Sequence, residues 1–192
     1  ASVYAPSLGR PLDALKVAML NLRAKLPQGT RFEAVATTGS GRHLAKEALQ
    51  ALCAIDEITA QAASARRYAP AARMVFEIGG QDSKFISFDD GETTNFIMNR
   101  ACAAGTGSFL EEQAGRLGVA INDSFSEAAF AAESAVELGS RCAVFMDSDL
   151  VSRVQRGAGK NELCAGLAYA AARNYLEKVV GSAKIEGEIV FQ

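Results

Sequence analysis

RMVFEIGGQDSKFISFDDGETTNFIMN, residues 73–99, is the stretch that decides the fold. Apolar and polar residues alternate in it over three runs, which is the period of strands with one buried face. Gly79-Gly80 separates the first two runs, and Asp89-Asp90-Gly91 forms a hairpin-type turn between the second and the third. The stretch therefore predicts a three-strand meander.

Helical periodicity dominates on both sides of this meander. Before it, we predict helices at residues 11–26, about 42–51 and 55–68, with a short buried strand at 32–37 and a glycine turn at 38–41. After it, we predict helices at residues 106–117 and 124–133, from Asp147 or Ser148 to about Arg156, and at 160–181, and a last strand in GEIVFQ at 187–192. Cys53 and Cys164 fall within helical apolar patterns and are interpreted as packing residues.

The bulk properties exclude several classes of protein. A length of 192 residues suits one domain or one and a half, and a net charge of -2 gives no broad basic surface of the kind that binds nucleic acid or an anionic membrane. Small molecules or proteins are therefore the expected partners. Charges interrupt every long apolar stretch, and the N-terminus does not resemble a signal peptide, so we expect a cytoplasmic protein. The four cysteines include no CxxC pair, which argues against a disulfide framework and a self-contained zinc site.

The loop between the first two predicted strands, EIGGQDSKF at residues 77–85, is the first candidate site. Gly79-Gly80 allows backbone N–H groups to point into a concave anion site that a phosphate can approach closely, because glycine has no Cβ. Glu77 and Asp82 are placed to hold a hydrated Mg²⁺, which prefers one or two carboxylates plus phosphate oxygens. A plain β-hairpin explains the glycine pair as well, and from that pair alone it is the simpler interpretation.

The second candidate is NRACAAGTGSFLEE at residues 99–112, where small residues and a Gly-Thr-Gly lead into a helix. Free N–H groups and the positive end of the helix dipole make such a start an anion site and favour a thiolate at Cys102. A glycine-rich helix entry with an inert buried cysteine is the alternative. Cys142, in GSRCAVFMDSDL at residues 139–150, is by itself more typical of a small buried residue than of a ligand.

Five motifs taken together resemble the BadF/BadG/BcrA/BcrD ATPase family, which includes activators of 2-hydroxyglutaryl-CoA dehydratase and subunits of benzoyl-CoA reductase. They are TTGSGR (37–42), DEIT (56–59), EIGGQDSKFI (77–86), MNRACAAGTGSFLEEQA (98–114) and CAVFMDSDLVS (142–152). They occur in the order of the family, and the resemblance extends from about Leu12 to Gln192. The cysteine-GTG-FLE motif is the most specific of them.

The resemblance implies an α/β protein with the acetate kinase/hexokinase/actin-like fold. It implies ATP-driven transfer of a low-potential electron to a CoA-ester dehydratase or reductase, from a [4Fe-4S] cluster that two subunits of a homodimer share. Cys102 and Cys142 match the cluster cysteines, and four thiolates from two chains would complete the cluster. Gly79, Gly80, Gln81 and Asp82 match the second phosphate loop for ATP or ADP with Mg²⁺. The segment Gly105, Thr106, Gly107 matches the helix start near nucleotide and cluster.

Three departures from the family pattern bear on activity. The first phosphate loop and the adenosine loop have no counterpart in residues 1–192, so we expect the central part of one domain, truncated at both ends, with weak or absent ATPase activity alone. Glu77 stands where shorter activators have Asp, as in longer multi-domain members. A nucleotide-regulated module of a larger protein, without electron transfer, is therefore the alternative function. An actin-fold small-molecule kinase would have no use for Cys102 and Cys142. In the nucleotide site, Lys84 is placed either to neutralise phosphate charge or to point away from it.

Overall fold

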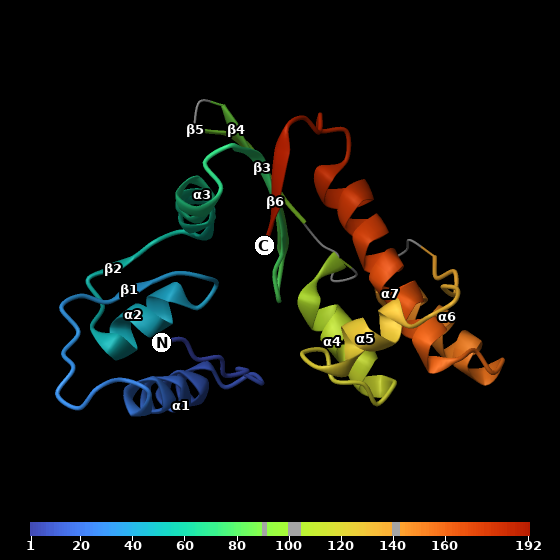
Figure 1. Cartoon of the computed structure of the whole chain (residues 1–192), viewed down its shortest axis with the longest axis horizontal. Coiled ribbons are helices and arrows are strands. Elements are labelled where there is room, and N and C mark those ends of the chain that lie inside the picture. Colours follow the sequence, from blue (N-terminus) through green and yellow to red (C-terminus); the bar gives the residue numbers. More distant parts are fainter. Residues whose placement is uncertain (90–91, 100–104, 140–142) are drawn as a thin grey trace. The chain divides into compact units, whose positions relative to one another are not determined.

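The computed structural model describes residues 1–89, 92–99, 105–139 and 143–192 (Figure 1). Its contacts divide the chain into two compact units, Ala1–Ala63 and Ser64–Gln192. Helix α3, Glu57–Tyr68, contains the boundary between them. Asp56 caps this helix, since its Oδ1 accepts the N–H of Thr59 at 2.9 Å. The hydrogen bond from the Thr59 hydroxyl, together with this backbone bond, lowers the pKa of Asp56.

The first unit combines two helices with two short strands and buries few side chains. They are α1 (Pro11–Ala24), β1 (Ala36–Thr37), α2 (Arg42–Leu49) and β2 (Cys53–Ala54). Strands β1 and β2 pair in parallel, with Ala36 opposite Cys53. Two sequence predictions are wrong here, because the expected strand at 32–37 shrinks to two residues and Cys53 lies in a strand, not in a helix. Both follow from pairing between distant segments, which local periodicity does not encode.

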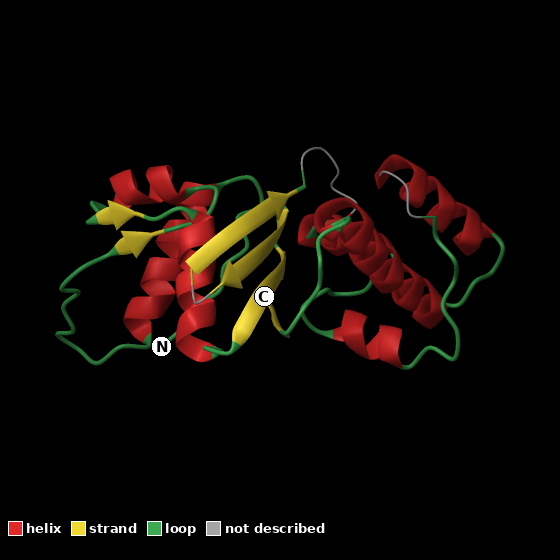
Figure 2. Ribbon diagram, turned by 90° about the horizontal axis from the view of Figure 1, so that it is seen from above, coloured by secondary structure: helices red, strands yellow, loops and turns green. Residues whose placement is uncertain are grey.

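A four-stranded sheet organises the second unit. Its strands are β3 (Ala72–Ile78), β4 (Ser83–Asp89), β5 (Glu92–Met98) and β6 (Glu188–Phe191), in the order β5-β4-β3-β6. Figure 2 shows the strands of this sheet side by side in yellow. Strands β3, β4 and β5 are antiparallel neighbours, which confirms the predicted meander. β6 runs parallel to β3, so the chain needs the crossover that the helices between β5 and β6 provide.

The helices of this crossover surround α7. They are α4 (Gly107–Arg116), α5 (Ser124–Phe130), α6 (Ala143–Gln155) and α7 (Lys160–Tyr175), which continues as the π-helical turn η2 (Leu176–Val180). Helix α7 buries nine residues, including Cys164. Burial raises the pKa of the Cys164 thiol. Helix α6 begins at Ala143 and not at the Asp147 or Ser148 cap that the sequence predicted. Met146, in the first turn of α6, is fully buried in the core around α7.

The end of α7 packs on the sheet and fixes β4. Phe76 makes an edge contact with Phe85, with ring centroids 5.7 Å apart, and lies 5.5 Å from the ring of Tyr175. The Tyr175 hydroxyl donates a hydrogen bond of 2.7 Å to the carbonyl of Lys84. Burial raises the pKa of Tyr175 well above that of an ordinary tyrosine. Within the described ranges, every helix is too short or too polar to cross a membrane.

Candidate functional site

The loop Gly79 to Asp82, between β3 and β4, is hydrogen-bonded to the first residues of α4. The N–H of Gly107 donates to the carbonyl of Gly79 at 2.8 Å, and the N–H of Ser108 donates to the carbonyl of Gly80 at 3.1 Å. Trans peptides place N–H opposite C=O, so the N–H groups of Gly80 and Gln81 both point away from α4. Neither N–H has an acceptor among the described residues. Two adjacent amides directed to one side are the arrangement that an anion site of the predicted kind requires.

The segment Gly105, Thr106, Gly107 supports the loop, and one expectation about its N–H groups is wrong. The sequence suggested free N–H groups at the start of α4, but the N–H groups of Gly107 and Ser108 are occupied by the loop carbonyls. A Cβ at Gly107 would lie 3.3 Å from the carbonyl oxygen of Gly79, so glycine permits this close approach. Thr106, buried at the N-cap position, adopts an extended backbone. The N–H groups of Gly107 and Ser108 therefore hold the loop and are not free to bind a ligand.

Ser83 links the loop to this segment and was missed by the sequence analysis. Its hydroxyl, fully buried, donates to the carbonyl of Gly105 at 2.6 Å. Its N–H donates to Asn99 Oδ1 at 2.9 Å, which joins β4 to the end of β5. A serine at the first, inward-facing position of a strand is only a weak sequence signal for such a link. The carbonyl that it bonds, that of Gly105, lies 22 residues later in the chain.

The two candidate carboxylates, Glu77 and Asp82, meet at a buried lysine. Lys84 is 1% exposed, and its Nζ lies 3.3 Å from Glu77 Oε2 and contacts Asp82 Oδ1. Glu77 and Lys84 are direct cross-strand partners, which places both side chains on the same face of the sheet. The Asp82 side chain remains 27% exposed, so a cation can reach it beside the loop. The alternation in β4 thus directs Lys84 toward the carboxylates.

The predicted cluster ligands, Cys102 and Cys142, lie outside the described residues. The helices that follow them are described, and both α4 and α6 pack on α7. Arg116 of α4 also forms an ion pair with Asp147 of α6, and this pair raises the pKa of Arg116. In the core between these helices, Asn174 donates to Met146 Sδ at 3.2 Å. The segments after the two cysteines are therefore connected through one helical core.

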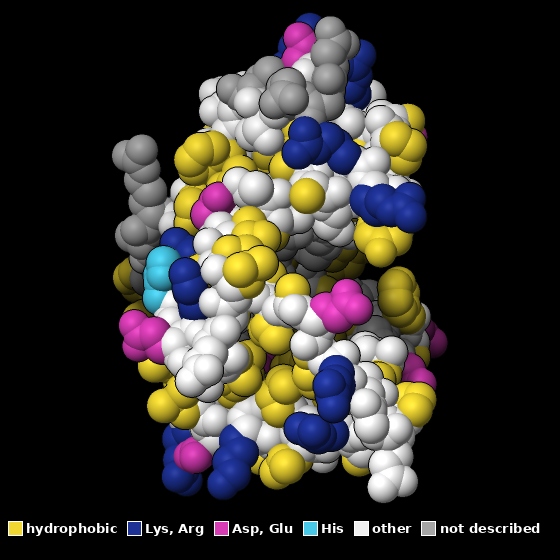
Figure 3. All heavy atoms as spheres, turned by 90° about the vertical axis from the view of Figure 1, so that its left-hand side faces the viewer, with side chains coloured by type: hydrophobic (Ala, Val, Ile, Leu, Met, Phe, Trp, Pro, Cys, Tyr) yellow, Lys and Arg dark blue, Asp and Glu magenta, His cyan; other side chains and the backbone are white. Residues whose placement is uncertain are grey.

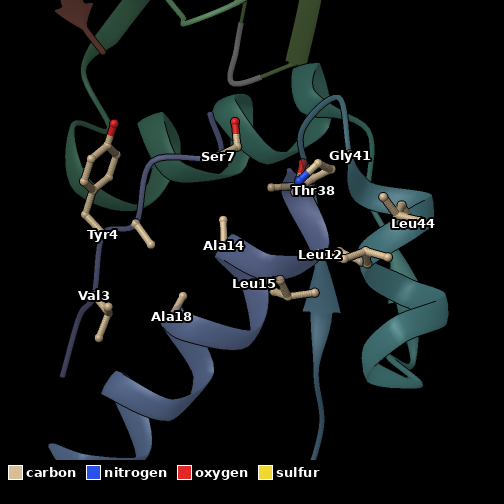
Figure 4. A pocket seen from close by; sticks show the side chains of 13 residues that line it. Val3, Tyr4, Ser7, Leu12, Ala14, Leu15, Ala18, Thr38, Gly41 and Leu44 are labelled. Atoms are coloured by element: carbon tan, nitrogen blue, oxygen red, sulfur yellow. The ribbon is translucent and has the colours of Figure 1, made fainter. Parts of the chain in front are cut away.

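A hollow of about 370 Å³ in the first unit includes Thr38 and Gly41 of the TTGSGR motif and none of the candidate site residues (Figure 4). Its labelled lining residues are Val3, Tyr4, Ser7, Leu12, Ala14, Leu15, Ala18, Thr38, Gly41 and Leu44. Apolar side chains from α1 form much of its wall, and it has no ionisable side chain except the Tyr4 phenol.

On the face shown in Figure 3, Lys and Arg side chains form small groups among acidic and apolar ones.

Comparison with known proteins relates this geometry to a family. The sequence model of the BadF/BadG/BcrA/BcrD ATPase family matches residues 13–192. The chain belongs to this family. Within the BadF/BadG/BcrA/BcrD family, it is 38% identical over 171 residues to the uncharacterized protein YjiL of Escherichia coli, covering 88% of the chain and 63% of YjiL. It is 35% identical over 133 residues to the (R)-2-hydroxyglutaryl-CoA dehydratase activating ATPase of Acidaminococcus fermentans, covering 69% of the chain and 49% of that protein. The chain thus spans about half to two thirds of these relatives.

Solved structures establish the fold of this BadF/BadG/BcrA/BcrD member. The activator of 2-hydroxyisocaproyl-CoA dehydratase from Clostridium difficile, solved with bound ADPNP, has a TM-score of 0.81 at 27% identity, covering 92% of the chain and 65% of that structure. Component A of the Acidaminococcus fermentans (R)-2-hydroxyglutaryl-CoA dehydratase has a TM-score of 0.78 at 28% identity, covering 96% and 68%. The chain therefore has the predicted α/β, actin-like ATPase fold.

Proposed function

We propose that the protein binds ATP and Mg²⁺ at the loop Gly79 to Asp82 and acts as an ATP-dependent activator of a CoA-ester dehydratase or reductase. One observation carries the nucleotide site: the N–H groups of Gly80 and Gln81 point together to the side of the loop opposite α4. A phosphate there would accept both bonds without displacing any described contact. The ADPNP-bound activator from Clostridium difficile supports a nucleotide as the ligand.

The residues of the loop have separate roles in this proposal. Gly79 and Gly80 provide the close backbone approach, and Gln81 contributes the second amide. Asp82, whose side chain is partly exposed, would hold a hydrated Mg²⁺, and the more deeply buried Glu77 would add a second negative charge beside it. Gly105, Thr106 and Gly107 hold the loop on α4. Hydrolysis would then depend on how firmly α4 fixes the loop.

The coupled step in this proposal is electron transfer to a CoA-ester dehydratase or reductase, and the dehydratase activators among the relatives support a partner enzyme of this class. Cys102 and Cys142 of each subunit would hold a [4Fe-4S] cluster between two copies of the chain, and the bound cluster would supply a low-potential electron to the acyl-CoA enzyme. The protein would act in the cytoplasm. ATP can drive this transfer only if it binds one arrangement of the dimer more tightly than the other.

Anaerobic reconstitution with iron and sulfide tests the cluster. The protein should show a [4Fe-4S] absorbance and EPR spectrum with one cluster per dimer, and the Cys102→Ser and Cys142→Ser variants should lose it. Cys164→Ser is the matched control, because Cys164 is buried in α7 and should not contribute. If the full-length protein takes up no specific iron but still binds ADPNP, it is instead a nucleotide-regulated module.

A separate titration tests the nucleotide site. Binding of Mg²⁺-ADPNP to the full-length protein should weaken on the order of tenfold or more in Asp82→Asn, since the metal loses a charged ligand. Asp89→Asn, at the far end of β4, is the control and should bind as the unmodified protein does. Equal affinities in the two variants would exclude Asp82 from the site.

A further inference from the structure

Lys84 is a buried cation between the two carboxylates of the proposed nucleotide site. Its side chain is 1% exposed, and its ammonium contacts Glu77 Oε2 at 3.3 Å and Asp82 Oδ1. An unpaired buried ammonium is unfavourable, so these contacts hold Lys84 in place as much as they hold the acids. Both ion pairs direct the ammonium of Lys84 toward the two acids.

The surroundings give Lys84 little freedom to leave this position. The Tyr175 hydroxyl bonds to the carbonyl of Lys84 at 2.7 Å, and Glu77 lies directly across the strand pair. Glu77 is buried, and its carboxylate lies so close to Gly79 that a Cβ there would be 2.5 Å from Oε1. Asp82 is the least confined of the three charged groups, since its side chain is 27% exposed. Its orientation therefore depends on Lys84 more than that of Glu77 does.

The charge balance of this trio determines what it attracts. Two carboxylates and one ammonium leave a single net negative charge, and one oxygen of Asp82 is already in contact with Lys84. Without Lys84, Glu77 and Asp82 would present two negative charges to a divalent cation. Mg²⁺ and Mn²⁺ bind oxygen ligands more tightly as the number of negative ligands increases. The lysine thus lowers the affinity for a cation that arrives without phosphate.

We propose that Lys84 is a positioning residue that prevents a divalent cation from binding at Glu77 and Asp82 in the absence of nucleotide. It does so by occupying Asp82 Oδ1 and cancelling one of the two charges. The remaining Asp82 oxygen is then sufficient only when nucleotide phosphates supply the other ligands. This inference rests on the proposed nucleotide site and assigns a role to a residue that contacts neither phosphate nor metal.

Titration with Mn²⁺ in the absence of nucleotide and cluster tests the inference, with the EPR signal of the free ion as the measure of binding. Lys84→Met should bind Mn²⁺ at least about tenfold more tightly than the unmodified protein. Lys160→Met removes a lysine at the start of α7, away from the trio, and should leave Mn²⁺ binding unchanged. Lys84→Arg keeps the charge and should resemble the unmodified protein. Unchanged Mn²⁺ affinity in a Lys84→Met protein with normal circular dichroism would overturn the inference.

Two double variants show where Mn²⁺ binds in Lys84→Met and control for destabilisation by unpaired acids. Lys84→Met/Asp82→Asn should return Mn²⁺ binding to the unmodified level, and continued tight binding would place the metal elsewhere and refute the inference. Lys84→Met/Glu77→Gln preserves the net charge of the trio and so avoids two unpaired acids. It should still bind Mn²⁺ more tightly than the unmodified protein, because both Asp82 oxygens are released. Since no nucleotide is present, these results do not depend on whether the protein hydrolyses ATP.

Discussion

At the scale of single residues, Gly79 and Gly80 make a matched test of the loop. A Cβ at Gly79 would lie 2.5 Å from Glu77 Oε1 and 2.8 Å from the carbonyl oxygen of Asp82, whereas a Cβ at Gly80 would meet nothing within 4 Å. The Asp82 carbonyl is backbone and cannot move alone. We therefore expect Gly79→Ala to lower the free energy of unfolding by about 1–3 kcal/mol, measured by urea denaturation.

Gly80→Ala should change the same free energy by less than about 0.5 kcal/mol. The comparison is informative because the two glycines are adjacent and differ only in the space around them. Equal destabilisation by the two substitutions would mean that the loop does not pack around Glu77 as described.

The sequence indicated the loop between the first two strands of the meander but not all of the contacts that the loop makes. The motif around Gly79-Gly80 identified the loop, and the paired amides of Gly80 and Gln81 agree with the predicted anion site. The amides of Gly107 and Ser108 were wrongly predicted to be free, because only tertiary docking decides which carbonyls face the start of a helix. The direction of Lys84 was open for the same reason. Its partner Glu77 is fixed by strand register, which the sequence does not display.

At the scale of elements, α7 packs against the other helices of the second unit, and its glycine, Gly166, lies in a close contact that leaves no room for a side chain. A Cβ at Gly166 would lie 2.5 Å from both Cγ2 and the carbonyl oxygen of Val136. Gly166→Ala should therefore reduce the free energy of unfolding by about 1–3 kcal/mol despite the better helix propensity of alanine.

Gly115→Ala in α4 is its counterpart, because nothing lies within 4 Å of a Cβ there. It should raise stability by up to about 1 kcal/mol, the usual advantage of alanine over glycine in a helix. Thermal unfolding of both variants decides the matter. A stabilising Gly166→Ala would show that α7 and the Val136 segment are not in close contact.

The contact between α7 and β4 should be visible in the pH dependence of stability. Burial raises the pKa of Tyr175 above its unfolded value of about 10, so its contribution is complete below pH 10. Above that pH the unfolded chain loses the phenol proton while the folded protein keeps it, and stability falls by up to about 1.4 kcal/mol per pH unit. Urea midpoints between pH 8 and about pH 11 measure this slope.

Two variants isolate the Tyr175 contribution from other groups that titrate at alkaline pH. Tyr175→Phe should flatten the slope of stability against pH. At neutral pH it should also lower the free energy of unfolding by about 1 kcal/mol, because the hydrogen bond to the Lys84 carbonyl is lost. Tyr169→Phe, at an exposed position of the same helix, should retain the slope. If Tyr175→Phe and Tyr169→Phe gave the same pH dependence, the Tyr175 phenol would not be buried in solution.

Most helices and the meander were predictable because their periods are local. Helix α4 lies within the predicted 106–117, and α7 with η2 covers nearly all of the predicted 160–181. The boundaries that failed depend on distant partners. Ala36–Thr37 pairs with Cys53–Ala54, and the register of that pair is set by chain segments that no local window contains.

At the scale of the whole molecule, the two units differ in how much apolar surface they bury. In Ala1–Ala63 the buried hydrophobic residues are Ala51 and Ala62, both small. Ser64–Gln192 contains large fully buried side chains such as Phe85, Met146 and Leu167. Burial of a large side chain contributes roughly 1.5–3 kcal/mol, so local opening should cost far more in the second unit.

Hydrogen exchange measured by mass spectrometry should separate the two units. Amides of α1, which has no buried residue, should exchange with little protection, whereas those of α7 should exchange only through the global unfolding of its unit. Strong protection of α1 would contradict this expectation. It would show that another surface covers the apolar side chains of α1, and a dependence of that protection on protein concentration would identify the cover as a second copy of the chain.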